Sequence, residues 1–304
     1  MTSVLGELRL VGAGGEPVDF KRTLYSHGVA ELPPHDIDIE AETLTATVTL
    51  GPGRARTIRI GRNSSHHLRV ELLADRAGAS DSERLLATAA HILRLDEDLS
   101  SFYARAREDP ALDWAALGAG RMIRSATVFE DVVKTVCTTN CTWGGTVRMV
   151  TALVDDLGDE APDGRRAFPT PEAMATTPIG FYRDVARAGY RGAYLRSLAD
   201  SVASGELDLE GLLDSELADE DVLERLLALP GVGPYAAAHI MMTSLGRYSR
   251  LVLDAWTRPK YARVTGARRT VADRTIERRF RRYGQYAGLA FWLVCTQDWV
   301  EATG

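Results

Sequence analysis

Two patterns of hydrophobic and polar positions divide the chain near residue 80. Before it, apolar and polar residues alternate over Leu44–Leu50, Thr57–Ile60 and Leu68–Leu72, and Gly51-Pro52-Gly53 offers a turn between the first two runs. Such alternation is typical of antiparallel strands that bury one face. After it, apolar residues recur at helical spacing without further alternation. The patterns predict an α+β protein, with a small antiparallel β domain over residues 1–80 and a helical body over residues 81–304.

A short run with two glycines, Leu229-Pro230-Gly231-Val232-Gly233, separates two helical patterns. It describes a tight turn, because glycine adopts left-handed backbone angles and leaves room for another backbone to approach. The helix expected to begin at Pro234 directs its free N–H groups and the positive end of its dipole toward this turn, which favours a phosphate. Asp254 follows the apolar run Leu251–Leu253 and is the candidate catalyst. The simpler alternative is a structural turn and a surface Asp.

The charges of the chain are unevenly distributed. The formal net charge is −6, which is unusual for a protein that binds nucleic acid. Between Met241 and Ala290, however, twelve Arg and Lys residues stand against three Asp and Glu residues, a local net charge of +9. We expect this basic field to attract a polyphosphate, whereas the acidic remainder limits nonspecific binding. A solvated helix face, with each Arg paired to a carboxylate, is the alternative.

Length and cysteine content narrow the class of protein. A chain of 304 residues with 45% hydrophobic content can bury a large core. We expect neither a membrane span nor a secretory signal, because no apolar run is long enough and the first residues lack the signal pattern. This favours a cytoplasmic location. Three cysteines are too few for a disulfide framework or a four-thiolate iron–sulfur cluster, and Cys137 and Cys141 are interpreted as packing thiols of one helix, so no metal site is expected.

The turn and Asp254 together resemble the helix-hairpin-helix/Gly-Pro/Asp superfamily of base-excision DNA glycosylases, in which the hairpin holds the DNA backbone and the Asp drives cleavage of the N-glycosidic bond. Further motifs, in the same order along the chain, resemble its 3-methyladenine (type II) and 8-oxoguanine glycosylase branches. They are Phe20–Pro34, Phe129–Val133, Cys137–Asn140, Gly189-Tyr190-Arg191, and Gly284–Gly288 with Gln285 where the family has Pro. The resemblance implies a two-lobed, all-helical core after the β domain, with a catalytic lobe over about residues 126–259 that contains the hairpin at 229–233.

The resemblance also implies roles for single residues at the DNA surface. The backbone of the DNA would lie against Leu229, Gly231, Val232 and Gly233. Tyr190 would fill the gap left by an extruded nucleotide, while Arg191 and Asn140 would offer hydrogen bonds to the estranged partner base. The simpler roles are a surface aromatic for Tyr190 and a helix cap for Asn140.

The catalytic role that the resemblance implies for Asp254 also has a chemical basis. Cleavage of a glycosidic bond passes through a cation-like sugar, which a fixed carboxylate stabilises while it orients or deprotonates a water molecule. The lyase-competent members carry a Lys two residues after the second hairpin Gly, and this chain has Tyr235 there. A phenol cannot form the imine of the lyase reaction. We therefore expect water to be the nucleophile and an abasic site to be the product. A helix N-cap is the alternative role for Asp254.

Four residues are the candidates for the base pocket: Tyr235, His239, Phe291 and Trp292. Aromatic walls suit an alkylated purine, whose positive charge stacks favourably on an indole or phenol face. The positions that correspond to the pocket Cys, Gln and Phe of the 8-oxoguanine enzymes hold His239, Phe291 and Cys295, which disfavours oxidised guanine as the substrate. Phe291 and Trp292 are equally compatible with a role as core aromatics.

The sequence thus predicts a monofunctional DNA glycosylase for damaged, most plausibly alkylated, purines in double-stranded DNA. The alternatives are an 8-oxoguanine or deaminated-base glycosylase with a rebuilt pocket, and a hairpin protein that binds DNA without catalysis. No cofactor is expected, although relatives hold a monovalent cation through the hairpin carbonyls. We expect a monomer that acts in the cytoplasm at the nucleoid, without a membrane partner.

Overall fold

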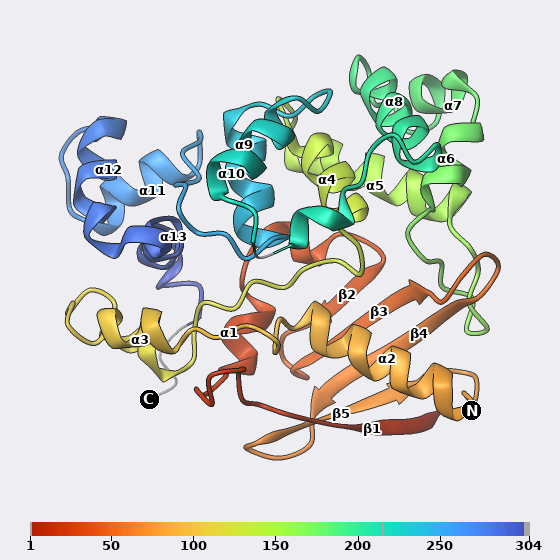
Figure 1. Ribbon diagram of the computed structural model, residues 1–304, viewed down its shortest axis with the longest axis horizontal. Helices are drawn as coiled ribbons and strands as arrows, with labels where there is room; N and C mark the ends of the chain where they lie inside the picture. Colours follow the sequence, from red (N-terminus) through yellow and green to blue (C-terminus); the bar gives the residue numbers. More distant parts are fainter. Residues whose placement is uncertain (1, 215, 301–304) are drawn as a thin grey trace.

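The computed structural model describes residues 2–214 and 216–300. Most of its helices, from α4 to α13, form a layer above a β-sheet (Figure 1). The five strands are β1 (Ser3–Arg9), β2 (His35–Asp38), β3 (Thr43–Thr49), β4 (Ala55–Arg62) and β5 (His67–Leu72). The longer helices of the body are α2 (Ala79–Ile92), α4 (Val128–Thr138), α5 (Trp143–Leu157), α8 (Arg191–Ala203), α9 (Asp219–Leu227), α10 (Pro234–Thr243), α11 (Thr257–Val264), α12 (Asp273–Phe280) and α13 (Ala287–Thr296).

Shorter helical segments connect these elements. The short α-helices are α1 (Phe20–Leu24), α3 (Ser100–Ala106), α6 (Pro171–Thr176) and α7 (Ile179–Asp184). The 3₁₀ turns are η1 (Gly28–Glu31), η2 (Asp113–Leu117), η3 (Glu210–Leu213) and η4 (Arg281–Tyr286). None of the helices in the described part of the chain combines the length and the apolar character that a membrane span requires.

The predicted sheet is confirmed, and it is larger than the sequence pattern indicated. All pairs are antiparallel, in the order β1-β5-β4-β3-β2. The three predicted runs correspond to β3, β4 and β5, and their apolar residues Leu44, Ile58, Ile60, Leu68 and Val70 are fully buried. The expected exposed face is absent from β3, since Thr45 and Thr47 are buried too. β1 and β2 lie at the two edges of the sheet, where the alternation is weaker.

The core of the sheet continues beyond residue 80. Helix α2 begins at Ala79, contacts β1 and β4, and contributes Leu85, Ala89 and Ile92 to the same hydrophobic cluster as the strands. The packing unit around the sheet therefore includes α2. A domain boundary at residue 80 stays a prediction.

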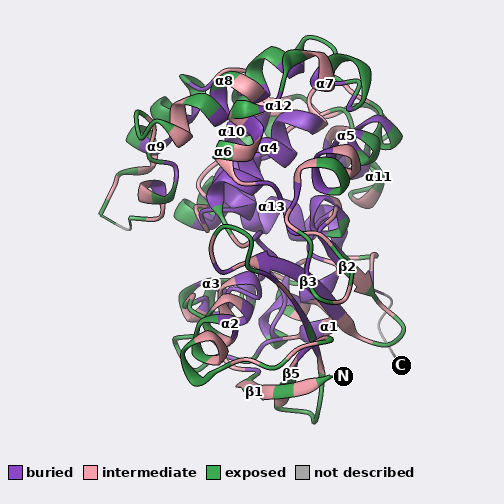
Figure 2. Cartoon of the chain, turned by 90° about the vertical axis from the view of Figure 1, so that its right-hand side faces the viewer, coloured by how far each residue is buried: buried purple, intermediate pink, exposed green. Residues whose placement is uncertain are grey.

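The helical body has two hydrophobic cores, as the α+β, two-lobed fold requires. One core surrounds α4 and includes residues of α5, α6, α8, α9 and α10, and the other joins α3, α11, α12 and α13. Helix α10 lies between them, since Ala237 and Ile240 belong to the first core and Ala238 and Met242 to the second. Figure 2 shows the buried residues gathered where α4, α10 and α13 meet, with exposed residues on the outer faces.

Buried arginines hold the sheet unit to the end of α10. Arg121 donates to a carboxylate oxygen of Glu16 and to the Glu97 carbonyl, at 3.0 Å for the latter. Arg94 donates to the Met122 carbonyl at 3.1 Å and to the carbonyls of Thr243 and Ser244 at the end of α10. Because both guanidinium groups are almost fully buried, these bonds fix α10 against the sheet unit.

Candidate active site

The predicted hairpin joins α9 to α10. Gly231 has φ +82°, and a Cβ at this position would lie 2.9 Å from Tyr194 Cδ2 and 3.2 Å from Val136 Cγ1. Gly233 has an extended backbone, with φ −101° and ψ −175°, and a Cβ there would meet open space. The first glycine is thus required by conformation and packing, whereas the second leaves the turn accessible from outside.

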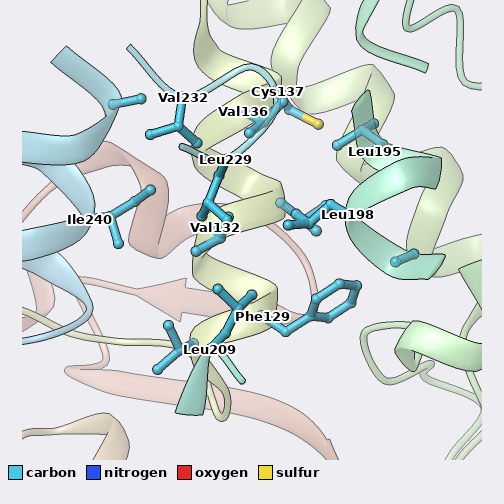
Figure 3. Close-up of a cluster of buried hydrophobic side chains, with 14 of the residues drawn as sticks. Phe129, Val132, Val136, Cys137, Leu195, Leu198, Leu209, Leu229, Val232 and Ile240 are labelled. Carbon is cyan, nitrogen blue, oxygen red and sulfur yellow. The ribbon is translucent and has the colours of Figure 1, made fainter. Parts of the chain in front are cut away.

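The apolar residues of the hairpin point inward. Leu229 and Val232 pack against α4 beside Val132 and Val136, in the cluster that Figure 3 shows. Both are less than a tenth exposed, so only their peptide groups could touch DNA. At the start of α10, Pro234 occupies the first turn and no side chain caps the helix. The first turn of α10 therefore keeps N–H groups without a capping side chain, the feature of a helix start that favours anions in general.

A cavity of about 400 Å³ opens between the two helical cores. Its wall includes four predicted site residues, Tyr235, His239, Asp254 and Trp292. The other lining residues are Gly28, Val29, Thr138, Cys141, Trp143, Thr146, Val252, Trp256 and Trp299. This volume falls within the range of small-molecule pockets and is sufficient for a purine base.

The carboxylate of Asp254 is held by the backbone that follows it. Its Oδ1 accepts hydrogen bonds from the N–H groups of Trp256 at 2.9 Å and Thr257 at 2.6 Å. In return, Thr257 Oγ1 accepts from the Asp254 N–H at 2.9 Å. This reciprocal cap fixes the start of α11 and leaves Oδ2 without a hydrogen bond from any described residue. A capping role and a catalytic role are therefore compatible.

Tryptophan rings form much of the wall of the cavity. Trp256, Trp292 and Trp299 contact one another with ring centroids 5.5 to 6.0 Å apart. Trp292 Nε1 donates to the Ser26 carbonyl at 2.8 Å, which fixes its orientation. A fourth indole, Trp143, is 47% exposed at the start of α5 and also lines the cavity. Of the four, the sequence analysis singled out Trp292 and missed the others.

Two buried histidines lie next to each other, and one of them, His239, lines the cavity. Burial lowers the pKa of His239 to about 3 and that of His27 to about 4, so both rings are neutral at neutral pH. His239 Nδ1 lies 3.5 Å from Thr135 Oγ1 and 3.4 Å from Thr243 Oγ1. The two imidazoles meet edge to face at 5.8 Å. His239 thus offers an uncharged hydrogen-bonding group in the cavity wall.

Tyr235 occupies the position at which, by the resemblance, the lyase-competent enzymes carry a lysine. Its hydroxyl lies 3.5 Å from Thr138 Oγ1, and burial raises its pKa above the ordinary value. The sequence has three lysines, and none lines the cavity. Lys134 is buried with Glu130 at 2.7 Å, and Lys260 binds Asp298 at 2.6 Å. The cavity wall therefore supplies no lysine amine.

The structure brings two of the three predicted wedge residues together at the surface. Tyr190 is 54% exposed at the start of α8, and Asn140 Nδ2 donates to its hydroxyl at 3.4 Å. Asn140 is exposed and has φ +45°. Arg191 is 7% exposed and donates to the carbonyls of Thr139 and Asn140, so it positions the loop that carries Asn140. Its contact with an estranged base stays a prediction.

Phe291 requires a correction. It is fully buried between Tyr261 and Phe280, at centroid distances of 5.8 and 5.5 Å, and does not line the cavity. Phe291 and Trp292 are neighbours on α13, so their side chains point in directions about 100° apart, and only Trp292 reaches the cavity. Phe291 is a core aromatic.

Cys141 also differs from the prediction. Helix α4 ends at Thr138 and α5 begins at Trp143, so Cys137 and Cys141 are not on one helix. Cys137 is buried in the core around α4, and Cys141 lies in the loop that lines the cavity.

The described residues include no cluster of His, Cys, Asp and Glu suited to a metal ion. A monovalent cation at the hairpin would need backbone carbonyls, and one of these, Leu229 O, already accepts from the Val232 N–H at 3.2 Å. The chemistry proposed below does not require such an ion.

Comparison with known sequences finds relatives that are named as DNA glycosylases, although no family model matches the chain. The DNA-3-methyladenine glycosylase of Bacillus subtilis is 24% identical over 215 residues, which cover 68% of this chain and 70% of that protein. A Methanothermobacter thermautotrophicus protein named "Probable N-glycosylase/DNA lyase" is 24% identical over 250 residues, covering 74% and 77%. The Bacillus subtilis protein YfjP is 31% identical over 88 residues, covering 29% of this chain and 30% of its own length.

Solved structures match nearly the whole chain. The 3-methyladenine DNA glycosylase from Archaeoglobus fulgidus has a TM-score of 0.75 at 19% identity, covering 96% of this chain and 98% of its own. The Clostridium acetobutylicum 8-oxoguanine glycosylase/lyase, in complex with double-stranded DNA, has a TM-score of 0.71 at 19% identity, covering 92% and 91%. The resemblance indicated by the motifs is therefore confirmed: the chain is similar in sequence to DNA-3-methyladenine glycosylases and shares the fold of 3-methyladenine and 8-oxoguanine DNA glycosylases.

Proposed function

We propose that this protein is a DNA glycosylase that hydrolyses the N-glycosidic bond of an extruded, alkylated purine and leaves an abasic site. One observation carries the proposal. The fixed carboxylate of Asp254 lies in the wall of a tryptophan-lined cavity of base size, which is also lined by Tyr235 and His239 of α10, the helix that follows the hairpin. The names of the sequence relatives, which include a DNA-3-methyladenine glycosylase, support the same class of reaction.

The hairpin is the proposed clamp on the DNA backbone. The open space at Gly233 and the uncapped first turn of α10 allow backbone N–H groups to contact a phosphate. Such contacts are independent of base sequence. They suit an enzyme that must search undamaged DNA.

The cavity can receive a base only after the nucleotide leaves the duplex. Tyr190 is the proposed wedge, because a large exposed aromatic ring can stack in the gap that the nucleotide leaves. Asn140, bonded to the Tyr190 hydroxyl, is the proposed contact to the estranged base. Arg191 holds the backbone of that loop and is a positioning residue.

Asp254 is the proposed catalytic residue. The C1′–N bond breaks with its electron pair leaving on the base, and the cationic sugar that forms is stabilised by the carboxylate. Water then adds through its oxygen to C1′, and its proton passes to the Asp254 carboxylate and on to solvent. The two backbone N–H donors on Oδ1 hold the group in place, so that Oδ2 can face the sugar and the water.

The wall of the cavity favours an electron-poor base. A purine alkylated on a ring nitrogen carries positive charge, which stacks favourably on the faces of Trp256, Trp292 and Tyr235. The same charge makes the base a better leaving group. His239 is neutral and does not repel it.

Water is the proposed nucleophile because the cavity wall has Tyr235 and no lysine. One chain supplies the hairpin, Asp254 and the cavity, so we infer that a monomer acts on double-stranded DNA, in the cytoplasm and at the nucleoid.

The test is mass spectrometry of the bases released from alkylated, oxidised and deaminated DNA. We expect 3-methyladenine or 7-methylguanine to be released, intact abasic strands as the other product, and no covalent complex after borohydride treatment. Release of 8-oxoguanine alone would favour the second glycosylase class. If wild-type protein binds DNA but releases no base from any substrate, the hairpin serves binding without catalysis.

A further inference from the structure

Five exposed arginines without partners form a patch at one end of the helical layer. They are Arg268, Arg269, Arg274, Arg278 and Arg281, and we call them the arginine patch. Within the part of the chain that the structure describes, none of them has an ion pair or a side-chain hydrogen bond. The last three lie on α12 and at its end, at spacings that place them near one another.

Five other basic residues of the same region are paired with carboxylates. Arg247 binds Asp219 at 2.8 Å, and Lys260 binds Asp298 at 2.6 Å. Arg250 and Arg258 also have carboxylate partners, Glu220 at 3.2 Å and Asp273 at 2.8 Å, and Arg282 binds Asp109. Of the seven basic residues of this region that no ion pair with a described residue compensates, five form the arginine patch; the other two are Arg263 and Arg279, which lies over the Phe280 ring.

A groove connects the patch with the hairpin. It has a volume of about 580 Å³, and its walls include Pro234 and Tyr235 at the start of α10 and Glu277 and Arg281 beside α12. Tyr235 lines both this groove and the aromatic cavity, so the two hollows are neighbours. Figure 1 shows α12 at the outer end of the helical layer, beyond α11 and α10.

We propose that the arginine patch binds phosphates of the duplex on one side of the lesion, so that the protein contacts DNA beyond the nucleotides held by the hairpin. The inference rests on the proposed function for the DNA itself. Guanidinium groups bind phosphate oxygens in a bidentate manner, and unpaired arginines give up no existing partner on binding.

Duplex DNA fits this surface better than an acidic protein does. The patch continues from a hairpin that already offers backbone N–H groups to a phosphate, across a groove lined by both elements. The regularly spaced phosphates of a DNA backbone can follow this path from the hairpin to the patch. The whole chain has a net charge of −6, so the residues outside this basic region are acidic. The patch therefore also orients the approach of DNA.

The test compares two double variants that each remove two unpaired or weakly bonded positive charges. Arg274→Gln with Arg278→Gln removes two of the three patch arginines on α12 and at its end, and Gln retains good helix propensity. The matched control is Arg9→Gln with Arg69→Gln, on β1 and β5 at the sheet end of the molecule (Figure 1). Affinity is measured by fluorescence anisotropy over a series of salt concentrations, on an undamaged duplex and on a duplex with an abasic-site analogue.

The patch variant should lower the slope of log Kd against log salt by about 1.8, because each phosphate contact contributes about 0.9. Between 50 and 200 mM salt this corresponds to about a tenfold smaller loss of affinity than wild type shows. Shortening the duplex on one side of the lesion should remove the difference between patch variant and wild type, while shortening the other side should not. The control variant should behave as wild type.

An unchanged slope in the patch variant, or an equal change in the control, would overturn the proposal. A difference that persists on duplexes shortened on either side would do the same, since the arginines would then act at the lesion itself. Preferential binding of the patch to an acidic peptide, with no effect on DNA, would assign it to a protein partner. Because these measurements need no base release, they remain informative if the proposed glycosylase activity fails.

Discussion

The two glycines of the hairpin should respond to the same substitution in opposite ways. At Gly231, alanine would have to adopt φ +82°, and its Cβ would lie 2.9 Å from Tyr194 Cδ2 and 3.2 Å from Val136 Cγ1. A left-handed conformation costs a residue with a Cβ about 1–2 kcal/mol. Displacing the packed neighbours adds about 1–2 kcal/mol. Gly231→Ala should therefore lower the free energy of unfolding by about 2–4 kcal/mol.

Gly233→Ala is the matched comparison. Its backbone is extended, and a Cβ there would meet no atom within 4 Å, so the protein should be as stable as wild type or more stable by about 0.4–1 kcal/mol. The added methyl group would nevertheless stand where a phosphate must approach. We expect Gly233→Ala to weaken binding to an abasic-analogue duplex at every sequence, because backbone contacts are lost.

The assays are urea unfolding, followed by circular dichroism, and fluorescence anisotropy with labelled duplexes. The expected pattern is a large loss of stability for the first variant and a loss of affinity without a loss of stability for the second. If Gly231→Ala unfolds at the wild-type urea concentration, the conformational argument is wrong. If Gly233→Ala binds DNA as tightly as wild type, the hairpin is not the clamp.

Three further predictions concern the buried polar groups. Glu16→Gln leaves Arg121 buried without its carboxylate and should lower the free energy of unfolding by about 3–5 kcal/mol, seen in urea titrations. Burial lowers the pKa of His27 to about 4 and that of His239 to about 3, so the stability that their neutral forms contribute is complete above pH 6.5 and is lost as the pH falls toward 4 and 3. The melting temperature should therefore fall between pH 7 and pH 4. A melting temperature that does not change with pH would contradict this. Arg191→Lys cannot reproduce the fork of bonds to the loop carbonyls, so base release under single-turnover conditions should slow while the far-ultraviolet spectrum is retained.

The sequence predicted those parts of the molecule that depend on local patterns. Strands β3, β4 and β5 followed from alternation, and the hairpin followed from its glycines and proline. Edge strands were missed because only one neighbour constrains their pattern. Helix α2 packs on the sheet, which no pattern in residues 79–92 indicates, because an apolar helix face does not specify its partner.

The sequence predicted only part of the site, because the tertiary fold decides which side chains face the cavity. Trp292 and Phe291 are adjacent, and nothing local determines which of them faces the cavity. Trp256 could have been found, since it follows Asp254 by two residues in the segment that caps α11. Trp299 comes from the segment after α13, and only the tertiary fold brings it to Trp256 and Trp292. The burial of Arg191 depends on the carbonyls of a distant loop.

The most direct test of the central claim is the single-turnover rate of base release by Asp254→Asn. An asparagine side-chain oxygen can still accept from the Trp256 and Thr257 N–H groups, so the cap of α11 remains while the negative charge is lost. The account predicts that release of an alkylated purine slows by about 10²–10³-fold, with affinity for lesion DNA retained. Release at the wild-type rate by this variant would contradict the assignment of Asp254 as the catalyst.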